Sequence, residues 1–196
     1  MYFLSKEEMN YLKKQVEKSM NILIIGGTGS GKTTVLNTLL DLISEDVFVG
    51  VVQNLPIIKS NRNNFLSFEY RYDEFGNIIN FLLQQERPDC LIIDDLMDNS
   101  FYELLHGIRY KNKNILMSMY GTDISKSLNN FYIQVENYNK YFESEVEIKS
   151  LLGKKLDLII HIERMNNGNR KLKLIEVVGY NEFTHKIELK EINLID

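Results

Sequence analysis

Hydrophobic and polar positions at the start of the chain predict a helix, a buried strand and a second helix. Ser5 and Glu8 have the spacing of a capping box, and apolar residues recur at helical intervals behind them, which predicts a helix over residues 6–18. Residues 22–25 form an unbroken apolar run, typical of a parallel strand that is covered on both faces. After a glycine-rich stretch, the apolar residues between 35 and 43 fall on one helical stripe.

The rest of the chain continues this alternation. Apolar and β-branched runs predict strands, and helical periodicity predicts helices. We expect strands at 47–52, 64–68, 90–95, 114–120 and 156–163, and helices at 78–85, 101–110 and, in two pieces, 126–152, with Gly153 as a helix C-cap. Asn-Gly within "NNGN" (166–169) predicts a tight turn, and residues 170–178 and 185–192 alternate as antiparallel strands do.

This order of elements predicts an α/β fold with a mostly parallel sheet flanked by helices and a C-terminal antiparallel hairpin. We expect a single domain over 1–196, divided into an N-terminal helix (1–20), a core (21–163) and a β-hairpin tail (164–196). The chain has only two prolines and no linker-like or repeated segment, which favours one compact unit.

The composition and charge of the chain limit the cellular compartment and the kinds of ligand and partner that we expect. The formal net charge of −4 argues against a chain-wide nucleic-acid surface, so we predict no direct contact with nucleic acid. Cys90 is the only cysteine, which favours a reducing cytoplasm, and we expect it to be a small buried hydrophobe. No apolar run approaches the ~20 residues that span a bilayer, and no signal-peptide core begins the chain. No cluster of ligand residues has metal spacing, so zinc is not expected.

Residues 26–33, "GGTGSGKT", match the pattern G-x-x-x-x-G-K-[ST] between a predicted strand and a predicted helix. In such a loop, backbone N–H groups surround phosphates, and the following helix directs its partially positive N-terminus at the same anion. Glycine is needed where the loop has positive φ or approaches other backbone closely. We expect ATP to contact eight residues: Gly27, Thr28, Gly29, Ser30, Gly31, Lys32, Thr33 and Thr34. Among them, Lys32 reaches the β- and γ-phosphates and Thr33 ligates Mg²⁺.

Two adjacent acids, Asp94 and Asp95, close the predicted strand "CLIIDD". The ligand of an open α/β sheet lies at the carboxyl ends of its strands, so both acids are expected at the nucleotide. We predict that Asp94 holds Mg²⁺ and that Asp95 activates the attacking water, which makes Lys32 and Asp95 the candidate catalytic residues. The alternative is a pair of solvated acids that caps the next segment.

Polar residues also follow two other predicted strands. Gln53 and Asn54 follow residues 47–52, and Ser118 and Tyr120 lie at the end of residues 114–120. All four could approach the γ-phosphate, and Gln53 and Tyr120 are the candidate γ-phosphate sensors. None of the four is a base at neutral pH, because amides do not titrate and tyrosine has a pKa near ~10.

Three segments, in order, resemble the motor ATPases of type II and type IV secretion, conjugation and pilus assembly. They are "NILIIGGTGSGKTT", "RPDCLIIDDLMD" and "LDLIIHIERMNNGNRKLKLIEVV". The resemblance covers the chain from about residue 5 to about residue 180. It implies a RecA-like P-loop domain of a cytoplasmic, ring-forming, often hexameric ATPase that powers a membrane-embedded machine. It also places Asp95 where the family has its catalytic glutamate.

Several polar elements of that family's site differ in this sequence. Its acidic box corresponds to the uncharged Gln53 and Asn54, Tyr120 stands at its histidine position, Met97 replaces an arginine and Asp94 replaces a glycine. We also expect no counterpart of the separate N-terminal domain that many relatives carry. Losing a group that positions water or stabilises developing charge typically removes ~10²–10⁴ in rate, whereas the nucleotide loop is intact.

Three functions remain open at this point. The first is a Mg²⁺-dependent ATPase, slow or partner-dependent, that powers or gates a secretion, pilus or DNA-transfer machine. The second is a catalytically impaired nucleotide-binding scaffold or regulatory subunit of such a machine. The third is a small P-loop kinase, although the six scattered arginines form no arginine-rich lid.

The resemblance also implies partners and a location. The partners would be further copies in a ring, such as a hexamer, or a related ATPase in a hetero-oligomer, together with membrane-embedded proteins of the machine. The location would be the cytoplasm, peripheral to the inner face of the cell membrane. Arg62, Arg71 and Arg109 are candidates for a finger that reaches a neighbour's γ-phosphate, with a surface arginine as the favoured interpretation of each. His161 is expected to be a strand histidine whose polar atoms are satisfied.

Overall fold

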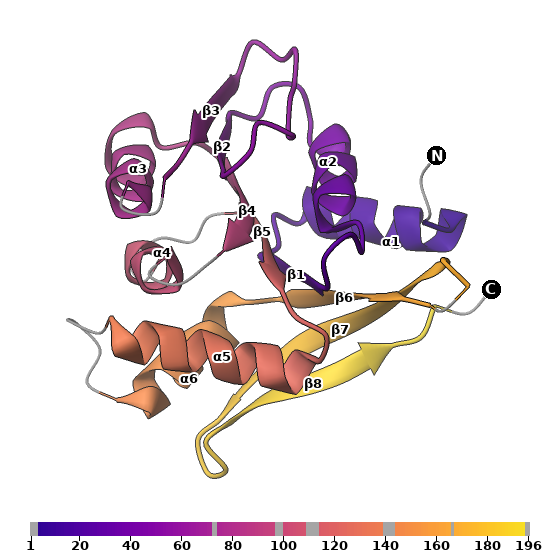
Figure 1. Ribbon diagram of the computed structural model, residues 1–196, viewed down its shortest axis with the longest axis vertical. Coiled ribbons are helices and arrows are strands. Elements are labelled where there is room, and N and C mark those ends of the chain that lie inside the picture. The colour runs from indigo at the N-terminus through magenta and orange to yellow at the C-terminus, as the bar shows by residue number, and fades with distance from the viewer. Residues whose placement is uncertain are drawn as a thin grey trace.

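In a computed structural model, strands and helices alternate along the chain up to two final antiparallel strands (Figure 1). The structure describes residues 4–71, 74–96, 100–108, 114–138, 144–165 and 167–194, with the backbone alone for 106–108. Its strands are β1 (Ile22–Gly26), β2 (Val49–Gln53), β3 (Phe65–Glu69), β4 (Cys90–Leu96), β5 (Asn114–Tyr120), β6 (Leu158–Arg164), β7 (Arg170–Asn181) and β8 (Lys186–Ile192). Its helices are α1 (Lys6–Glu17), α2 (Lys32–Leu42), α3 (Phe75–Phe81), the π-helical η1 (Leu82–Glu86), α4 (Ser100–Ile108), α5 (Ile124–Asn137) and α6 (Glu145–Lys155).

The strands form one sheet in the order β3-β2-β4-β5-β1-β6-β7-β8. In this sheet order, each strand from β3 through β6 pairs in parallel with the next. β7 pairs antiparallel with β6, and β8 pairs antiparallel with β7. The predicted mostly parallel sheet with a C-terminal antiparallel hairpin is therefore confirmed.

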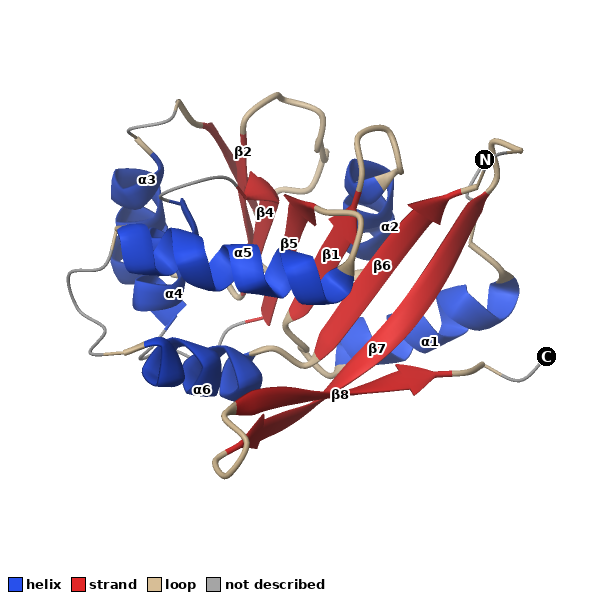
Figure 2. Cartoon of the chain, turned by 60° about the horizontal axis from the view of Figure 1, so that its bottom comes forward, coloured by secondary structure: helices blue, strands red, loops and turns tan. Residues whose placement is uncertain are grey.

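The central strands are buried on both faces because alternate side chains contact different helices. On β1, Ile22 and Ile24 pack in the cluster with α1 and α2, whereas Leu23 and Ile25 pack in the cluster with α3 to α6. All four side chains are fully buried. Figures 1 and 2 show α1 and α2 on one side of the sheet and the other helices on the opposite side. This double coverage explains the unbroken apolar run in the sequence.

Two local predictions from the sequence are confirmed. At the start of α1, the Ser5 hydroxyl accepts a hydrogen bond from the Glu8 N–H at 3.1 Å, and the Glu8 carboxylate accepts one from the Ser5 N–H at 2.7 Å. Cys90 is fully buried among apolar side chains, and burial raises the pKa of its thiol to about 12. The thiol is therefore a packing group, because nucleophilic and redox chemistry needs the thiolate.

The prediction that Gly153 caps a helix was wrong. Helix α6 continues through Gly153 to Lys155, and Leu156 is its C-cap. A Cβ atom on Gly153 would lie only 3.0 Å from the Cβ atom of Tyr180 and 3.3 Å from the backbone of Gly179. Glycine is therefore present because it lets α6 pack closely on β7, not because of its own backbone conformation.

Strands β7 and β8 form an antiparallel ribbon at one edge of the sheet (Figure 2). At its turn, the side-chain oxygen of Asn181 accepts hydrogen bonds from the N–H groups of Phe183 and Thr184, both at 3.0 Å. Between β6 and β7, Gly168 has φ +83°, as predicted for the Asn-Gly turn. Both connections are therefore fixed by local turn chemistry.

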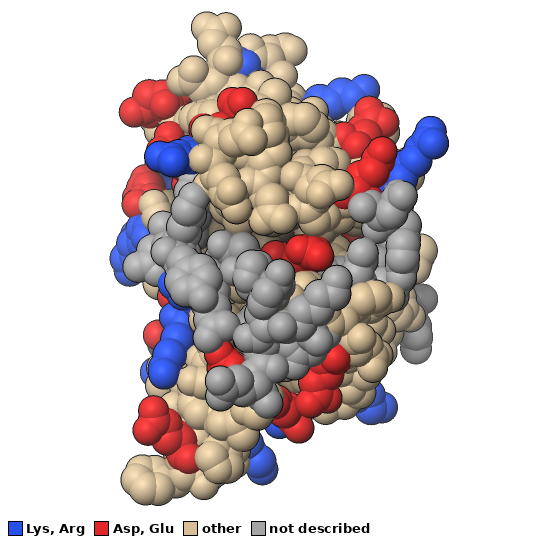
Figure 3. Space-filling model, turned by 90° about the vertical axis from the view of Figure 1, so that its left-hand side faces the viewer, with Lys and Arg blue, Asp and Glu red and all other residues tan. Residues whose placement is uncertain are grey.

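The face of the molecule drawn in Figure 3 shows no single dominant sign of charge among the described residues. On the face drawn in Figure 3, lysines and arginines alternate with aspartates and glutamates around the edge, and the described residues form no continuous basic patch there. Within the described ranges, no helix has both the length and the apolar character that a membrane crossing requires.

Candidate functional site

A cavity of about 400 Å³ lies beside the glycine loop at the carboxyl ends of the parallel strands. Four segments of the chain meet there: the glycine loop, the loop after β2, the end of β4 and the end of β5. The lining residues are Thr28, Gly29, Lys32, Thr33, Asn54, Leu55, Ile57, Asp94, Asp95 and Tyr120. The place is the one expected for the ligand of an open α/β sheet.

The backbone of the glycine loop explains why its glycines are required. Gly29 has φ +70° and Gly31 has φ +106°, both in the left-handed region that L side chains rarely adopt. A Cβ atom on Gly26 would overlap the Ser30 hydroxyl. Gly31 is also the N-cap of α2, so the loop passes directly into the helix N-terminus. The strand, loop and helix predicted as a phosphate-binding unit are thus present.

The Lys32 side chain folds back over this loop. Its Nζ donates hydrogen bonds to the carbonyl oxygens of Gly26 at 3.0 Å and Gly27 at 3.3 Å. An ammonium group has three donors, so it can keep such a bond while donating to an anion in the cavity that it lines. Thr34, at the start of α2, is exposed and lies outside the set of lining residues.

Thr33 and Asp94, the predicted Mg²⁺ ligands, are in direct contact. The Thr33 hydroxyl donates to Asp94 Oδ2 at 2.8 Å, and the Ser118 hydroxyl donates to Asp94 Oδ1 at 2.6 Å. Asp94 is buried, yet it still lines the cavity. Hydroxyl and carboxylate oxygens are the hard ligands that Mg²⁺ prefers, so the chemistry of this pair fits the ion.

A bulge at the end of β4 brings both acids to one cavity. Ile93 pairs with Met117 and Leu96 pairs with Met119, so three steps along β4 match two along β5. Asp95, within the bulge, has φ +63°. In a regular strand, successive side chains point to opposite faces. The extra residue breaks that alternation, and Asp94 and Asp95 both line the site.

The surroundings of Asp95 favour its protonated form. Burial raises the pKa of the Asp95 carboxyl group, the Lys32 ammonium opposes the rise, and the neighbouring Asp94 carboxylate adds to it. A carboxylate with a raised pKa is a better proton acceptor than a solvated one. The position and the basicity of Asp95 therefore both suit a group that takes a proton from water.

Gln53, predicted as a γ-phosphate sensor, is buried and holds the loop after β2. Its Nε2 donates to the Ile58 carbonyl at 3.0 Å and to the Ser67 hydroxyl at 2.9 Å. Its Oε1 accepts from the N–H groups of Ile57 and Ile58 at 3.0 and 2.8 Å. Both ends of the amide are therefore occupied within residues 53–67, and the structure brings the following residues of this loop, rather than Gln53, into the cavity.

The two polar residues at the end of β5 have different surroundings. Tyr120, the other predicted sensor, lines the cavity and is 59% exposed. Ser118 is fully buried and contacts Asp94 and Asp95 instead of the cavity. The structure thus brings Tyr120 to the site and leaves Ser118 behind the acids.

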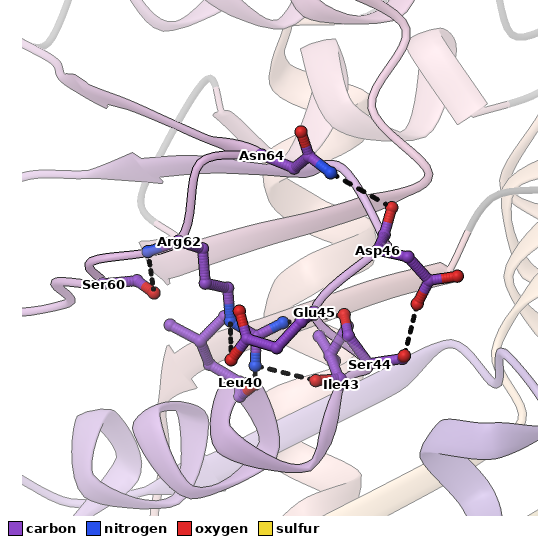
Figure 4. Close-up of polar contacts among 8 residues, drawn as sticks. All are labelled: Leu40, Ile43, Ser44, Glu45, Asp46, Ser60, Arg62 and Asn64. Atoms are coloured by element: carbon purple, nitrogen blue, oxygen red, sulfur yellow. Dashed lines mark hydrogen bonds and ion pairs between the residues drawn. The ribbon is translucent and has the colours of Figure 1, made fainter.

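Arg62 is neither a free finger nor a surface arginine (Figure 4). Its guanidinium donates to the carbonyl oxygens of Leu40 at 2.6 Å, Ile43 at 2.7 Å and Ser44 at 2.9 Å. It also lies 3.8 Å from the Glu45 carboxylate, and its side chain is only 6% exposed. Both interpretations of Arg62 from the sequence were wrong, because it caps the C-terminal end of α2.

Two arginines that the sequence patterns did not single out flank the glycine loop. Arg164 ends β6, and its Nη1 would lie 3.8 Å from a Cβ atom on Gly29. Arg170 begins β7, and its Nη2 donates to the Gly29 carbonyl at 3.5 Å. The sequence feature that could have identified them is their position on either side of the Asn-Gly turn. Of the remaining predicted residues, Arg71 is exposed, and Arg109 and Met97 lie outside the described residues.

A second cavity of about 330 Å³ lies on the other flank of the glycine loop and is lined in part by Gly27, Ser30 and His161. Within the described part of the chain, the Ser30 hydroxyl and His161 Nε2 are buried without a hydrogen-bond partner. His161 Nδ1 lies 3.6 Å from Glu163, and burial lowers the pKa of the imidazole. The structure places His161 in β6, as predicted for a strand histidine. The cavity has room for water, which would satisfy both atoms.

Comparison with known proteins gives three findings. The chain matches the model of the family described as "Uncharacterised conserved protein UCP018868" over residues 2–187. It is 22% identical over 189 residues to the conjugal transfer protein TrbB of Rhizobium radiobacter, covering 94% of this chain and 57% of TrbB. It is 23% identical over 183 residues to the type IV secretion system protein VirB11 of Bartonella henselae, covering 89% of this chain and 50% of that protein.

The fold is shared with a solved secretion ATPase. The structure of the VirB11 ATPase from the Brucella suis type IV secretion system, in complex with sulphate, superimposes with a TM-score of 0.74 at 18% identity, covering 84% of this chain and 50% of that one. The RecA-like P-loop fold and the resemblance to the type II and type IV secretion ATPases are thus confirmed. The chain spans about half the length of the curated relatives it matches.

Proposed function

The chain belongs to the family described as "Uncharacterised conserved protein UCP018868", and we propose that it is a Mg²⁺-dependent ATPase domain with slow or partner-dependent turnover. One observation carries this proposal: the glycine loop, the Thr33–Asp94 pair and Asp95 all line one cavity. The similarity to TrbB and VirB11 supports a role in powering or gating a secretion, pilus or DNA-transfer machine.

The residues of the glycine loop and of α2 account for nucleotide binding. Residues 26–34 would bind the phosphates of ATP through backbone N–H groups and the partial positive charge of the α2 N-terminus. Lys32 would donate to the phosphate oxygens from its place above the loop. Thr33 and Asp94 would hold Mg²⁺, which when bound neutralises charge on those oxygens. None of these groups is among the uncharged residues, Gln53, Asn54 and Tyr120, at which the sequence departs from the motor ATPases.

Hydrolysis would depend on Asp95. Its carboxylate would accept a proton from a water molecule whose oxygen attacks the γ-phosphorus, while the bond to the β–γ bridging oxygen breaks and ADP leaves. The raised pKa of Asp95 favours this proton transfer. Aspartate is one methylene shorter than glutamate, and small misplacements of a catalytic group can cost on the order of 10²-fold in rate. Turnover would therefore be slow unless a partner improves the geometry.

The rim of the cavity supports a protein partner. Leu55, Ile57 and Tyr120 line the cavity and are 63%, 55% and 59% exposed. Exposed apolar residues that cluster at a ligand site are typical of a surface that another protein covers. We propose that further copies in a ring, or a related ATPase in a hetero-oligomer, cover this rim, and that the complex acts in the cytoplasm, peripheral to the inner face of the membrane.

The second candidate function is a nucleotide-binding scaffold without efficient turnover. It is favoured by the side of the cavity that would face the γ-phosphate, where Asn54 and Tyr120 supply neither a carboxylate nor an imidazole. Binding would then act as a signal for assembly. The two functions share the loop and differ in the fate of the bound ATP.

The experiment is ATP binding and single-turnover hydrolysis on one purified sample, with Lys32→Ala and Lys13→Ala variants. Lys13 is an exposed residue of α1 and serves as the matched control. Conversion of bound ATP to ADP that is lost in Lys32→Ala and kept in Lys13→Ala would support the ATPase. Binding through Lys32 without conversion, even with a partner added, would favour the scaffold. Absence of ATP binding would refute both.

A further inference from the structure

We propose that the hydroxyl groups of Tyr70 and Ser118 position Asp95 for its reaction. They hold the Asp95 backbone in a left-handed conformation that directs its carboxylate into the nucleotide cavity. Tyr70 lies just after β3 and Ser118 lies in β5, so the two groups reach Asp95 from separate segments of the chain. The inference rests on the proposed function, in which Asp95 activates water.

The conformation of Asp95 needs an external restraint. Its φ of +63° is uncommon for a residue with a side chain, because the Cβ atom approaches the following carbonyl oxygen. Aspartate tolerates this region better than most residues, yet such backbone persists only where the surroundings impose it. The surrounding groups that bond to this residue are therefore the ones to identify.

Two hydroxyl groups bond to the backbone of Asp95. The Asp95 N–H donates to the Ser118 hydroxyl oxygen at 2.9 Å, and the Tyr70 hydroxyl donates to the Asp95 carbonyl at 3.0 Å. Ser118 in turn donates its own proton to Asp94 Oδ1 at 2.6 Å. Ser118 thus bonds to both Asp94 and Asp95, and Tyr70 bonds to the backbone carbonyl of Asp95.

Tyr70 is itself held rigidly. Its N–H donates to the Gln53 carbonyl at 3.0 Å, and its ring packs edge-on against Phe75 with centroids 5.0 Å apart. The side chain is buried, at 5% exposure. A phenol fixed at both its backbone and its ring places its hydroxyl at a defined point, which is what a positioning group requires.

The contact of Tyr70 predicts an effect on turnover without an effect on binding, whereas Ser118 also bonds to Asp94, so its loss is expected to affect Mg²⁺-dependent binding as well. Neither Tyr70 nor Ser118 is among the residues that line the cavity, so their hydroxyl groups do not contact the nucleotide. Without the restraint, residues 94–96 could relax toward regular strand geometry, in which adjacent side chains point to opposite faces. The Asp95 carboxylate would then leave the cavity, whereas the glycine loop would be unchanged.

The test compares Tyr70→Phe, Ser118→Ala and Ser118→Thr with wild type. Tyr180→Phe is the matched control, because its hydroxyl makes a bond of 3.0 Å to His185 on the distant hairpin. We expect Tyr70→Phe to lower kcat about three- to tenfold, as for loss of one neutral hydrogen bond, with ATP affinity within about twofold. Ser118→Ala should lower kcat at least about tenfold, because it removes bonds to both acids. Ser118→Thr, which keeps the hydroxyl, should recover most of that loss.

Asp95→Asn separates this inference from the proposed function. If Asp95→Asn abolishes turnover while Tyr70→Phe and Ser118→Ala keep the wild-type kcat, the positioning role is overturned and the proposed function stands. Tyr70→Phe should also cost nothing further when Asp95 is already asparagine. If the wild-type domain does not hydrolyse ATP, a crystal structure of Tyr70→Phe decides: loss of the positive φ at Asp95 supports the restraint, and an unchanged Asp95 overturns it.

Discussion

The two sides of the nucleotide cavity are built in different ways. The glycine loop is one continuous segment. It would bind phosphates mainly through backbone N–H groups, a helix terminus and Lys32. The opposite side is assembled from side chains after β2, β4 and β5, and there the sequence departs from the motor ATPases that it resembles. On the proposed function, the difference means that nucleotide binding and turnover would depend largely on separate residues.

Asp94 contacts Thr33 of the loop side and lies at the end of β4 on the opposite side, so changing it should affect both nucleotide binding and turnover. Asp94→Asn removes a carboxylate oxygen that contacts Thr33 and that would hold Mg²⁺. We expect turnover to fall about 10²-fold or more, because the metal supplies much of the charge stabilisation. ATP affinity should fall in Mg²⁺ but remain unchanged in EDTA, measured by titration calorimetry. An equal loss of affinity in both buffers would contradict the assignment.

Arg62 tests how far the loop side depends on the helix behind it. Arg62→Ala removes the guanidinium donor from three carbonyl oxygens at the end of α2, of which those of Leu40 and Ser44 keep a backbone N–H donor. We expect the free energy of unfolding to fall by about 2 kcal/mol, measured by urea denaturation. Arg62→Lys should recover only part of this loss, since an ammonium cannot reproduce the planar fork. Arg71→Ala, at an exposed position, is the control and should change stability by less than about 0.5 kcal/mol.

Tyr120 tests the side chains that face the γ-phosphate. The resemblance to the motor ATPases places Tyr120 at their histidine position, and Tyr120 lines the cavity. We expect Tyr120→His to raise the single-turnover rate by about tenfold at most, because one of several altered groups is restored and an imidazole can transfer protons near neutral pH. Tyr120→Phe should not raise the rate. A histidine variant no faster than the phenylalanine variant would show that this position does not limit turnover.

Much of the fold and the loop could be predicted from the sequence because the signals are local. The capping box at Ser5 and Glu8, the buried run of β1 and the phosphate loop each occupy one short segment. The roles of Arg62 and of the bulge at Asp95 could not be predicted, because each depends on distant partners. Gln53 bonds within residues 53–67, in a loop whose path no sequence pattern predicts. Arg62 contacts residues about twenty positions earlier in the chain, and the Asp95 backbone bonds to Tyr70, just after β3, and to Ser118 in β5.

The smallest expected effect is that of Asp95→Asn on the free energy of unfolding. It should differ in sign from the effect of the same change on turnover. The raised pKa means that the folded state binds the proton more tightly than the unfolded state does. The stability that Asp95 contributes is therefore present below its unfolded pKa of about 3.9 and is lost as the pH rises through the folded pKa. Asparagine is uncharged and also tolerates positive φ.

We therefore expect Asp95→Asn to be more stable than wild type at pH 7, by less than about 1 kcal/mol because the site is partly exposed. The gain should shrink as the pH is lowered toward about 4. Thermal unfolding at several pH values measures it. A variant that is less stable than wild type at neutral pH would contradict the claim that the folded state disfavours the Asp95 charge.

Binding and turnover, we propose, reside on separate residues of one cavity. The most direct measurement is ATP affinity and single-turnover hydrolysis of Asp95→Asn beside wild type, in the same Mg²⁺ buffer. We predict ATP affinity within about threefold of wild type and conversion to ADP slowed by about 10²–10⁴-fold. Hydrolysis by Asp95→Asn at the wild-type rate, or loss of ATP binding in that variant, would contradict this separation.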